Sequence, residues 1–407
     1  MTRRIYLDHH ATTPCDPRVV EAMLPWFTEH PGNASSPHAF GWEAREACER
    51  AQEQVGSLVG AAADHVVFTG SATESIHLAL VGLAERRAAR GRHLITSTFE
   101  HPAVLETLAL LESRGFEVTR VPVDGRGLVD PEAIERALRD DTIVCSIMWA
   151  NNEVGTVQPM AEIAEVCHGR GALVHSDACQ AVGRIPVDLE ATGVDLLTLS
   201  GHKMYGPKGI AALVIRRQRP RVRLQPQLVG GGQQHGLRSG TLPVPLIVGL
   251  GEAAALAEAE METEAARLRA LRDRLLARLE ADLAPVRVNG DRDRRLPGNL
   301  NVSFIGVEAE TVLLRLPGLG LSVGSACSAS HSEPSHVLKA LGVSDEHAHA
   351  TLRFGLGRGT TESELDEATD AIVETVRQLR EQSPTHRAVQ AGGPAGSEPA
   401  SAEEDRP

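Results

Sequence analysis

Residues 196–209 read LLTLSGHKMYGPKG, an apolar strand-like run followed by a glycine-rich loop with two lysines. The first four residues have the length and composition of a buried strand. Lys203 stands in the tight turn that follows it, whereas Lys208 comes after Pro207, where we expect a solvated turn. A partly desolvated lysine has the lowered pKa that Schiff-base formation requires. The stretch therefore predicts a reactive amine at the end of a buried strand.

Similar short apolar runs recur along the chain and alternate with segments of helical character such as residues 160–168. These runs are residues 66–68, 93–96, 143–148, 173–175, 196–199 and 211–215. Strands separated by helices predict an α/β fold with a mostly parallel sheet covered on both faces. Ligands of such sheets bind beyond the carboxyl ends of the strands. The residues that follow each run are therefore the candidates for a functional site.

A second domain is predicted beyond a long helix. Leucines at helical spacing indicate a helix over residues 253–283 that connects the two domains. Strand-like runs at 300–305 and 351–354 and a last helix over 361–378 follow it. We expect a large domain over 21–258, and a smaller α+β domain made of 1–20 with 259–382. Residues 383–407 are rich in Pro, Gly, Ala and Ser, which predicts a disordered tail.

Composition excludes several classes of function. The net charge is −13 and aromatic residues make up 3% of the chain, so direct nucleic-acid binding is not expected. One basic run, arginines 216 to 223, is more typical of a solvated loop. No apolar run is long enough to span a membrane, and the first residues lack a signal peptide. Six cysteines without metal or redox spacing favour a cytoplasmic protein with no metal site.

Three of the loops that follow strands carry polar residues with two interpretations each. Ala72 and Thr73, in the stretch TGSATES, stand at a helix start that could bind a phosphate, although an ordinary helix cap looks the same. His101 could stack on a flat ring or move a proton, but a lone histidine is more often structural. Asn151 and Asn152 need partners for their amides; a turn explains one, and a ligand explains Asn152 equally well.

The stretch HSDACQ adds an acid and an amide after residues 173–175. Asp177 at the end of a buried strand is costly unless a positive group faces it, and a protonated pyridine nitrogen would attract it by roughly 5 kcal/mol before desolvation. A buried helix-capping acid is the alternative. Gln180 could donate to a phenolic oxygen, and Ser200 and His202 beside Lys203 could complete a phosphate site. Together the loops predict a pyridoxal phosphate site.

Ten motifs, taken in order, resemble the cysteine desulfurases of the class V aminotransferase family, fold type I, over about residues 5–380. They are LDHHATTPCDPRV, GNASSPHAFG, SATES, EHPAVL, NNEVGTVQP, HSDACQ, SGHKMYGPKG, GGGQQHGLRSGTLP, VGSACSASHSEPSHVL and LRFGLGR. The resemblance implies a pyridoxal-phosphate-dependent transferase whose large domain has a mostly parallel seven-stranded sheet. It also implies a homodimer that acts on L-cysteine and serves a sulfur-acceptor protein.

The resemblance also assigns roles to individual residues. Lys203 becomes the lysine that binds the cofactor covalently, and His101 the ring-stacking acid/base. The remaining cofactor contacts are Ala72, Thr73, Asn152, Asp177, Gln180, Ser200, His202 and, from the neighbouring subunit, Thr241. Asn33, Asn152 and Arg353 would bind the substrate, since the planar guanidinium of Arg353 matches a carboxylate.

Cys327 would take the sulfur as a persulfide while L-alanine is released. It lies in a run of Gly, Ser and Ala over residues 322–332, and small side chains give such a loop little to anchor it. A small buried cysteine is the alternative. The pattern departs from the family at Ile76-His77, and Cys179 is a second thiol near the predicted cofactor site.

Two rival functions stay open. One is a selenocysteine lyase or another class V aminotransferase-like enzyme, which Cys327 in its small-residue loop disfavours. The other is a cofactor-free scaffold for sulfur acceptors, which the joint presence of Lys203, Asp177 and His101 disfavours. The sulfur acceptor itself could belong to iron–sulfur cluster assembly, tRNA thiolation or another thiolation system.

Overall fold

A seven-stranded sheet forms the centre of the larger part of the computed structural model, which describes residues 4–216, 222–323 and 333–382. Its strands are β2 (Val66–Thr69), β3 (His93–Ser97), β4 (Glu117–Val121), β5 (Thr142–Ser146), β6 (Leu173–Asp177), β7 (Leu196–Ser200) and β8 (Ala211–Ile215). They are ordered β2-β8-β7-β6-β5-β3-β4. All pairs are parallel except those of β8, which runs antiparallel to β2 and β7. The predicted mostly parallel sheet is confirmed.

Helices cover both faces of this sheet because successive strand residues point to opposite sides. Leu173 and Leu196 belong to the apolar cluster under α4 and α5, whereas Val174 and Leu197 belong to the cluster under α3 and α7. The helices of this part are α1 (Pro17–Met23), α2 (Pro25–Thr28), α3 (Ala39–Leu58), α4 (Ala72–Arg87), α5 (Pro102–Ser113), α6 (Pro131–Ala137), α7 (Met160–Gly169) and α8 (Leu189–Thr192). Short 3-10 turns lie at Ala63–His65, Gly201–Lys203 and Gln234–Gly236.

A smaller sheet has its own apolar cluster. Strands β12 (Ser322–Val323), β13 (Thr351–Gly355), β10 (Asn299–Phe304) and β9 (Val286–Val288) pair antiparallel in that order. Leu279, Phe304 and Phe354 are fully buried in this cluster. α10 (Ala309–Arg315), α13 (Glu362–Gln382) and the parallel pair β1 (Ile5–Tyr6) with β11 (Leu319–Gly320) contribute to this cluster. The buried residues of α11 (His336–Ala340) and α12 (Asp345–His349) belong to the cluster of the larger part.

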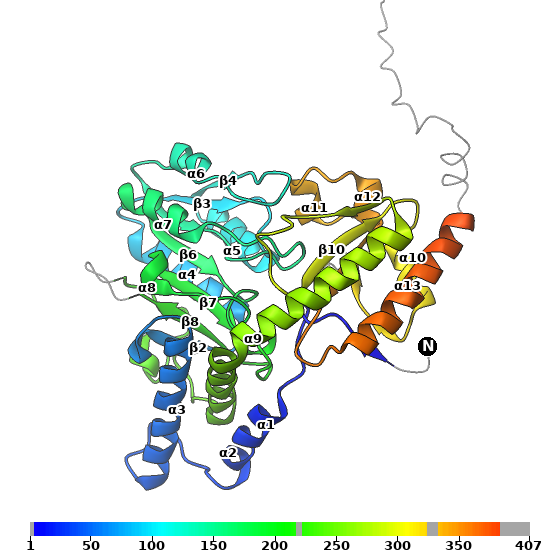
Figure 1. Ribbon diagram of the computed structural model, residues 1–407. Coiled ribbons are helices and arrows are strands. Elements are labelled where there is room, and N and C mark those ends of the chain that lie inside the picture. The colour runs from blue at the N-terminus through cyan, green and yellow to red at the C-terminus, as the bar shows by residue number, and fades with distance from the viewer. Residues whose placement is uncertain (1–3, 217–221, 324–332, 383–407) are drawn as a thin grey trace, which may run out of the picture.

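One helix, α9 (Val244–Leu283), joins the two parts (Figure 1). It begins at Val244 rather than at the predicted Ala253. The helical pattern of this first part was hard to see because it contains Gly249 and Gly251. Close packing requires glycine at both positions, since a Cβ at Gly249 would lie under 3 Å from Met23 and a Cβ at Gly251 under 3 Å from Ala51. The predicted domain boundary at 258/259 falls inside this helix and stays a prediction.

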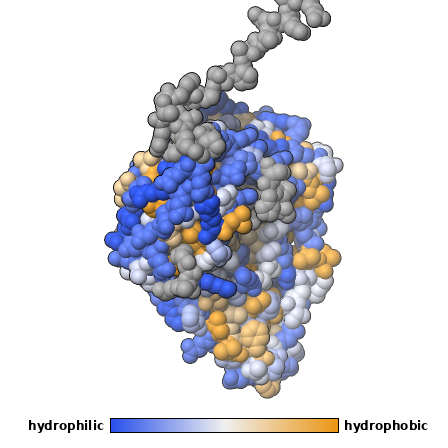
Figure 2. All heavy atoms as spheres, turned by 90° about the vertical axis from the view of Figure 1, so that its right-hand side faces the viewer, coloured by the Kyte–Doolittle hydropathy of each residue, from blue (hydrophilic) through white to orange (hydrophobic). Residues whose placement is uncertain are grey.

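Large apolar side chains are exposed at the end of the molecule formed by α1, α2 and the start of α3. Figure 2 shows an apolar area toward the narrow lower end. Leu24, Phe27, Phe40 and Trp42, which belong to this part of the chain, are all exposed. The predicted tail and Cys327 lie outside the described residues. Within the described ranges, none of the helices combines the length and the apolar character needed to cross a bilayer.

Candidate active site

The predicted cofactor residues converge on one cavity of about 450 Å³ at the carboxyl ends of the strands. This volume lies in the range of small-molecule sites. The predicted residues that line the cavity are Ala72, Thr73, His101, Asn152, Asp177, Gln180, Ser200, His202 and Lys203. Of the predicted departure Ile76-His77, only Ile76 lines the cavity, and the second thiol, Cys179, lines it as well.

Lys203 ends the 3-10 turn that follows β7, so its amine lies beside the cavity. Lys203 Nζ donates to the carbonyl oxygens of His10 at 2.7 Å and Ala11 at 2.8 Å. The turn is tight: a Cβ on Gly201 would lie 2.9 Å from the carbonyl oxygen of Pro207. Lys208 also borders the cavity but is exposed, as predicted for a solvated turn.

The carbonyl oxygen of Lys203 is fixed by a half-buried arginine that the sequence did not single out. Arg184 Nη2 donates to the Lys203 carbonyl oxygen at 3.0 Å and to that of His9 at 2.7 Å. Arg184 Nη1 lies 2.8 Å from His10 Nδ1, and Gln180 Nε2 donates to the His10 carbonyl oxygen at 2.9 Å. The backbone around the reactive amine is therefore held from two sides.

Asp177 lies at the end of β6 and is buried, with a carboxylate that faces the cavity. Its Oδ1 accepts a hydrogen bond from the Cys179 backbone N–H at 3.0 Å. Residues 179–184 form turns rather than a helix, so Asp177 is not the helix cap that the alternative predicted. Burial raises the pKa of the Cys179 thiol well above its usual range, and the nearby Asp177 charge adds to this. Cys179 is consequently a poor thiolate despite its place in the cavity wall.

The amino terminus of α4, where the phosphate is predicted to bind, forms one end of the cavity. Ser71 caps the helix by accepting from the Glu74 N–H at 3.2 Å, and Glu74 accepts in turn from the Gly70 N–H at 2.7 Å. The helix-cap interpretation is confirmed, and phosphate binding stays a prediction that a capped helix start also favours. His202 lies nearby, and burial, with Lys203 next, lowers its pKa to about 4. His202 is therefore a neutral donor or acceptor there.

His101 precedes α5 and borders the cavity with a neutral ring. Its Nδ1 accepts from the Ala103 N–H at 3.1 Å, which leaves the ring proton on Nε2. Burial lowers the pKa of His101, although the negative Asp177 opposes this shift. The preceding residue, Glu100, was not predicted: it is fully buried, and burial raises its pKa to about 8. Glu100 therefore adds no second negative charge beside Asp177 at neutral pH.

The two asparagines after β5 divide their roles. Asn151 stabilises a turn, because its Oδ1 accepts from the backbone N–H groups of Glu153 and Val154 at 2.8 and 3.0 Å. Asn152 lines the cavity, and its carbonyl oxygen accepts from Arg353 Nη1 at 3.1 Å.

The other predicted substrate and subunit contacts lie apart from the cavity wall. Arg353 is buried behind Asn152 and forms an ion pair with Asp8 at 2.9 Å, while its Nε has no partner in the described structure. Asn33 is exposed and its Oδ1 accepts from the Ser35 N–H in a turn. Thr241 is exposed and is not among the residues of the cavity wall. The side chain of Cys327 lies outside the described residues.

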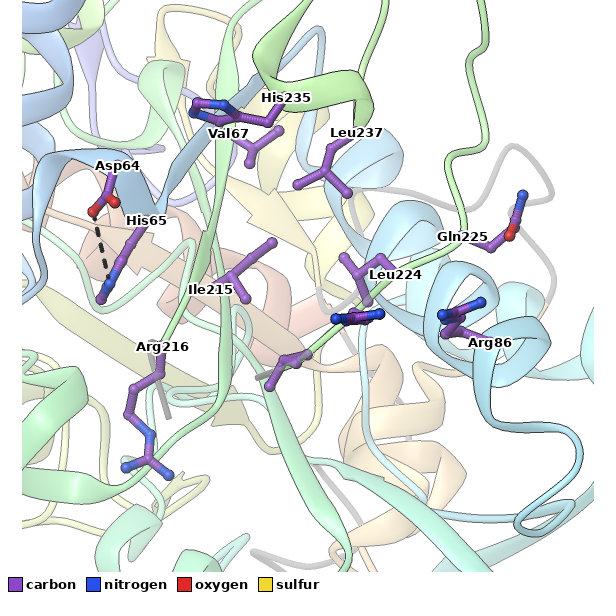
Figure 3. Close-up of a pocket in the computed structure, with 12 residues that line it drawn as sticks. Asp64, His65, Val67, Arg86, Ile215, Arg216, Leu224, Gln225, His235 and Leu237 are labelled. Atoms are coloured by element: carbon purple, nitrogen blue, oxygen red, sulfur yellow. Dashed lines mark ion pairs between the residues drawn. The ribbon is translucent and has the colours of Figure 1, made fainter. Parts of the chain in front are cut away.

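A second cavity, of about 390 Å³, lies at the other end of the large sheet (Figure 3). Ile215 borders this cavity and pairs with Leu196, whereas Ala211 at the opposite end of β8 pairs with Ser200 beside Lys203. Arg216, from the basic run, binds the buried Asp195 at 2.8 Å. This cavity is therefore separated from the reactive amine by the length of a strand.

The donor set of the first cavity fits pyridoxal phosphate. The α4 amino terminus with Ser200 and His202 suits the phosphate, and Asp177 suits a protonated ring nitrogen. Lys203 supplies the amine for the aldehyde, and the neutral ring of His101 lies at the same cavity.

Comparisons with known proteins agree with this geometry. The aminotransferase class-V family matches residues 5–367. Cysteine desulfurase IscS from Anaeromyxobacter dehalogenans is 52% identical over 389 residues, which cover 95% of this chain and 96% of that protein.

Two solved structures share the fold. A NifS-like protein has a TM-score of 0.86 and 38% identity, covering 92% of this chain and 100% of its own. SspA in complex with cysteine has a TM-score of 0.76 and 37% identity, and the match covers 86% of this chain and 98% of the SspA chain. The chain therefore belongs to the class-V aminotransferase family of pyridoxal-phosphate-dependent enzymes, on its cysteine desulfurase branch.

Proposed function

We propose that this protein removes sulfur from L-cysteine, releases L-alanine and keeps the sulfur as a persulfide on Cys327. In this reaction an S–S bond forms between the Cys327 thiolate and the substrate sulfur while the substrate Cβ–S bond breaks. The electron pair of the broken bond stays on Cβ, which a proton completes to the methyl group of alanine. The observation that carries the proposal is the convergence of Lys203, Asp177 and His101 on one cavity.

The cavity residues have distinct roles in this proposal. Bound pyridoxal phosphate supplies an aldehyde and an electron-withdrawing ring. Lys203 would hold that aldehyde, and its amine would take the proton from the substrate Cα. Asp177 would keep the ring nitrogen protonated through its negative charge. His101, with its proton on Nε2, would hold the ring and could donate that proton.

Arg353 is proposed to bind the substrate carboxylate together with Asn152 and Asn33. Its support is the buried Nε–H group, which has no partner among the described residues. A buried donor without a partner is costly, so an incoming carboxylate would gain a charge-assisted hydrogen bond there. The ion pair with Asp8 holds the guanidinium in place meanwhile.

The partners are also part of the proposal. We place the protein in the cytoplasm as a homodimer in which Thr241 contacts the phosphate in the neighbouring subunit, which agrees with the exposure of Thr241 in a single protomer. The exposed apolar side chains of α1 and α2 support contact with another protein. The sulfur would pass to an acceptor protein, in iron–sulfur cluster assembly as the IscS name of a relative suggests, or in thiolation.

Product analysis of the holoenzyme tests the proposal. With L-cysteine and a reducing agent, alanine and sulfide should form in equal amounts, and the visible absorbance of bound pyridoxal phosphate should change when cysteine is added. Release of alanine from L-selenocysteine alone would support a selenocysteine lyase instead. A purified protein without visible absorbance would support a cofactor-free scaffold.

A further inference from the structure

The stretch that contains Cys327 joins the described structure at two serines. Ser322, on β12, accepts a hydrogen bond on its hydroxyl from Arg353 Nη2 at 3.0 Å. Ser335, just before α11, donates from its hydroxyl to Glu153 Oε2 at 2.6 Å. Residues 324–332 lie between these serines and outside the described residues. Each flank of the Cys327 stretch is therefore bonded to an ionisable side chain from another part of the chain.

The Ser335 flank is attached in buried surroundings. Ser335 and Glu153 are 6% and 2% exposed, so their hydrogen bond is shielded from water and strengthened by the low local dielectric. The next residue, His336, donates from Nε2 to the Glu100 carbonyl oxygen at 2.9 Å. The start of α11 therefore contacts both the loop after β5 and the residue that precedes His101.

Glu153 is itself held firmly. Its backbone N–H donates to Asn151 Oδ1 at 2.8 Å, and its carbonyl oxygen accepts from Asn301 Nδ2 at 3.2 Å. Its neighbour Asn152 lines the cavity and accepts from Arg353 on its carbonyl oxygen. The two attachment points of the Cys327 stretch are thus connected to each other through Arg353 and the Asn152–Glu153 backbone.

We propose that Glu153 is a positioning residue for sulfur transfer, because its hydrogen bond with Ser335 fixes one flank of the Cys327 stretch against the loop that lines the cavity. The inference rests on the proposed function, in which Cys327 takes the sulfur. Glu153 does not line the cavity itself. Loss of its carboxylate therefore slows the transfer to Cys327 but leaves cysteine binding unchanged.

Two measurements on the holoenzyme test this role. In Glu153→Ala, the single-turnover rate of persulfide formation on Cys327 should fall about 10- to 100-fold, the range expected when a buried hydroxyl loses its hydrogen-bond partner. The cysteine concentration that gives half of the absorbance change should stay within about twofold. Independently of activity, amide hydrogen exchange in residues 335–341 should become faster, since the α11 start loses its attachment.

Rescue and control variants separate positioning from general damage. Glu153→Gln keeps an oxygen that accepts from Ser335 and should recover most of the rate. Ser335→Ala should reproduce the loss, whereas Ser335→Thr, which keeps the hydroxyl, should not. Glu258→Ala is the matched control, because Glu258 accepts from the Ser57 hydroxyl at 2.7 Å on a distant surface. That control should match the wild type in both measurements.

The outcomes distinguish this inference from the proposed function. If the wild type forms no persulfide on Cys327, the proposed function is wrong, and the inference fails with it. If the wild type forms it and Glu153→Ala does so equally fast, only the positioning role is wrong. An equal loss of cysteine binding and transfer in Glu153→Ala would also overturn that role. Should Glu153→Ala not fold, Ser335→Ala against Ser335→Thr decides the question.

Discussion

At the scale of single residues, Lys203 and Lys208 have the same chemistry but different surroundings. Lys203 is partly buried in its turn, and Arg184 donates a hydrogen bond to its backbone carbonyl oxygen. The Lys203 amine donates to the carbonyl oxygens of two further residues, His10 and Ala11. Lys208 is exposed at the rim of the same cavity. Position rather than residue type therefore distinguishes the predicted reactive amine from Lys208.

The first prediction compares these two lysines. Lys203→Ala should lose turnover and the cofactor link that borohydride fixes, because the only other cavity lysine among the described residues is exposed to water. Lys208→Ala should keep both. Mass mapping of the borohydride-reduced wild type should place the cofactor on Lys203, and cofactor found on Lys208 would show the assignment to be wrong.

Asp177 allows a second comparison, because Asp130 makes the same local contact. Each carboxylate accepts a backbone N–H two residues later at 3.0 Å, but Asp130 caps α6 on the surface. Asp177→Asn should lower turnover by about 100-fold or more, since a neutral amide no longer attracts a protonated ring nitrogen. Asp130→Asn should retain turnover. Near-normal turnover of a folded Asp177→Asn variant would remove Asp177 from the mechanism.

Sequence patterns located many residues of the cavity wall but missed most of the charged residues behind it. Lys203 and Asp177 follow recognisable apolar runs, so strand-end reasoning was enough to find them. Arg184, Glu100 and Asp8 act through contacts between segments far apart in the chain, and nothing in their local sequence distinguishes them from surface charges.

At the scale of elements, the connection from β3 to α5 contains a buried acid. Glu100 accepts from the Ser97 hydroxyl at 2.5 Å and from the Met148 N–H at 3.0 Å, and it lies directly before the cavity residue His101. Its raised pKa, about 8, means that the folded state holds a proton that the unfolded chain has lost above pH 4.5.

The third prediction follows from the sign of that shift. Between about pH 5 and pH 8, the free energy of unfolding of the wild type should fall as the pH rises, by at most about 1.4 kcal/mol per pH unit relative to Glu100→Gln. The variant lacks this dependence because its amide does not titrate. Urea unfolding midpoints of both holoproteins at several pH values measure the difference. Parallel pH curves would show that Glu100 is not protonated in the folded protein.

The elements that the sequence did not reveal have weak patterns for physical reasons. β4 is an edge strand with four of its five residues partly or fully exposed, so it lacks the apolar run of its neighbours. β5 ends at Ser146, two residues before the predicted end, because the apolar run continues into the buried loop toward Asn151. Buried strands were predictable, whereas exposed edges and buried loops were not.

At the scale of the whole molecule, Thr241 tests whether the subunits share active sites. A mixed dimer of one Lys203→Ala subunit and one Thr241→Ala subunit should contain one complete site, because the intact Thr241 faces the intact Lys203 across the interface. A dimer of wild type with a Lys203→Ala/Thr241→Ala subunit should contain none. Cofactor retention of the two purified mixed dimers measures this, and the reverse order would place Thr241 in its own subunit's site.

The fate of the sulfur atom is the most direct test of the whole account. After the wild-type holoenzyme reacts with L-cysteine in the absence of reductant, peptide mass mapping should show one extra sulfur on Cys327. Cys327→Ser should keep the cofactor absorbance and cysteine binding but lose alanine formation, because a hydroxyl is a far poorer nucleophile toward sulfur than a thiolate. Extra sulfur on Cys179 alone, or full alanine formation by Cys327→Ser, would contradict the proposed sulfur transfer.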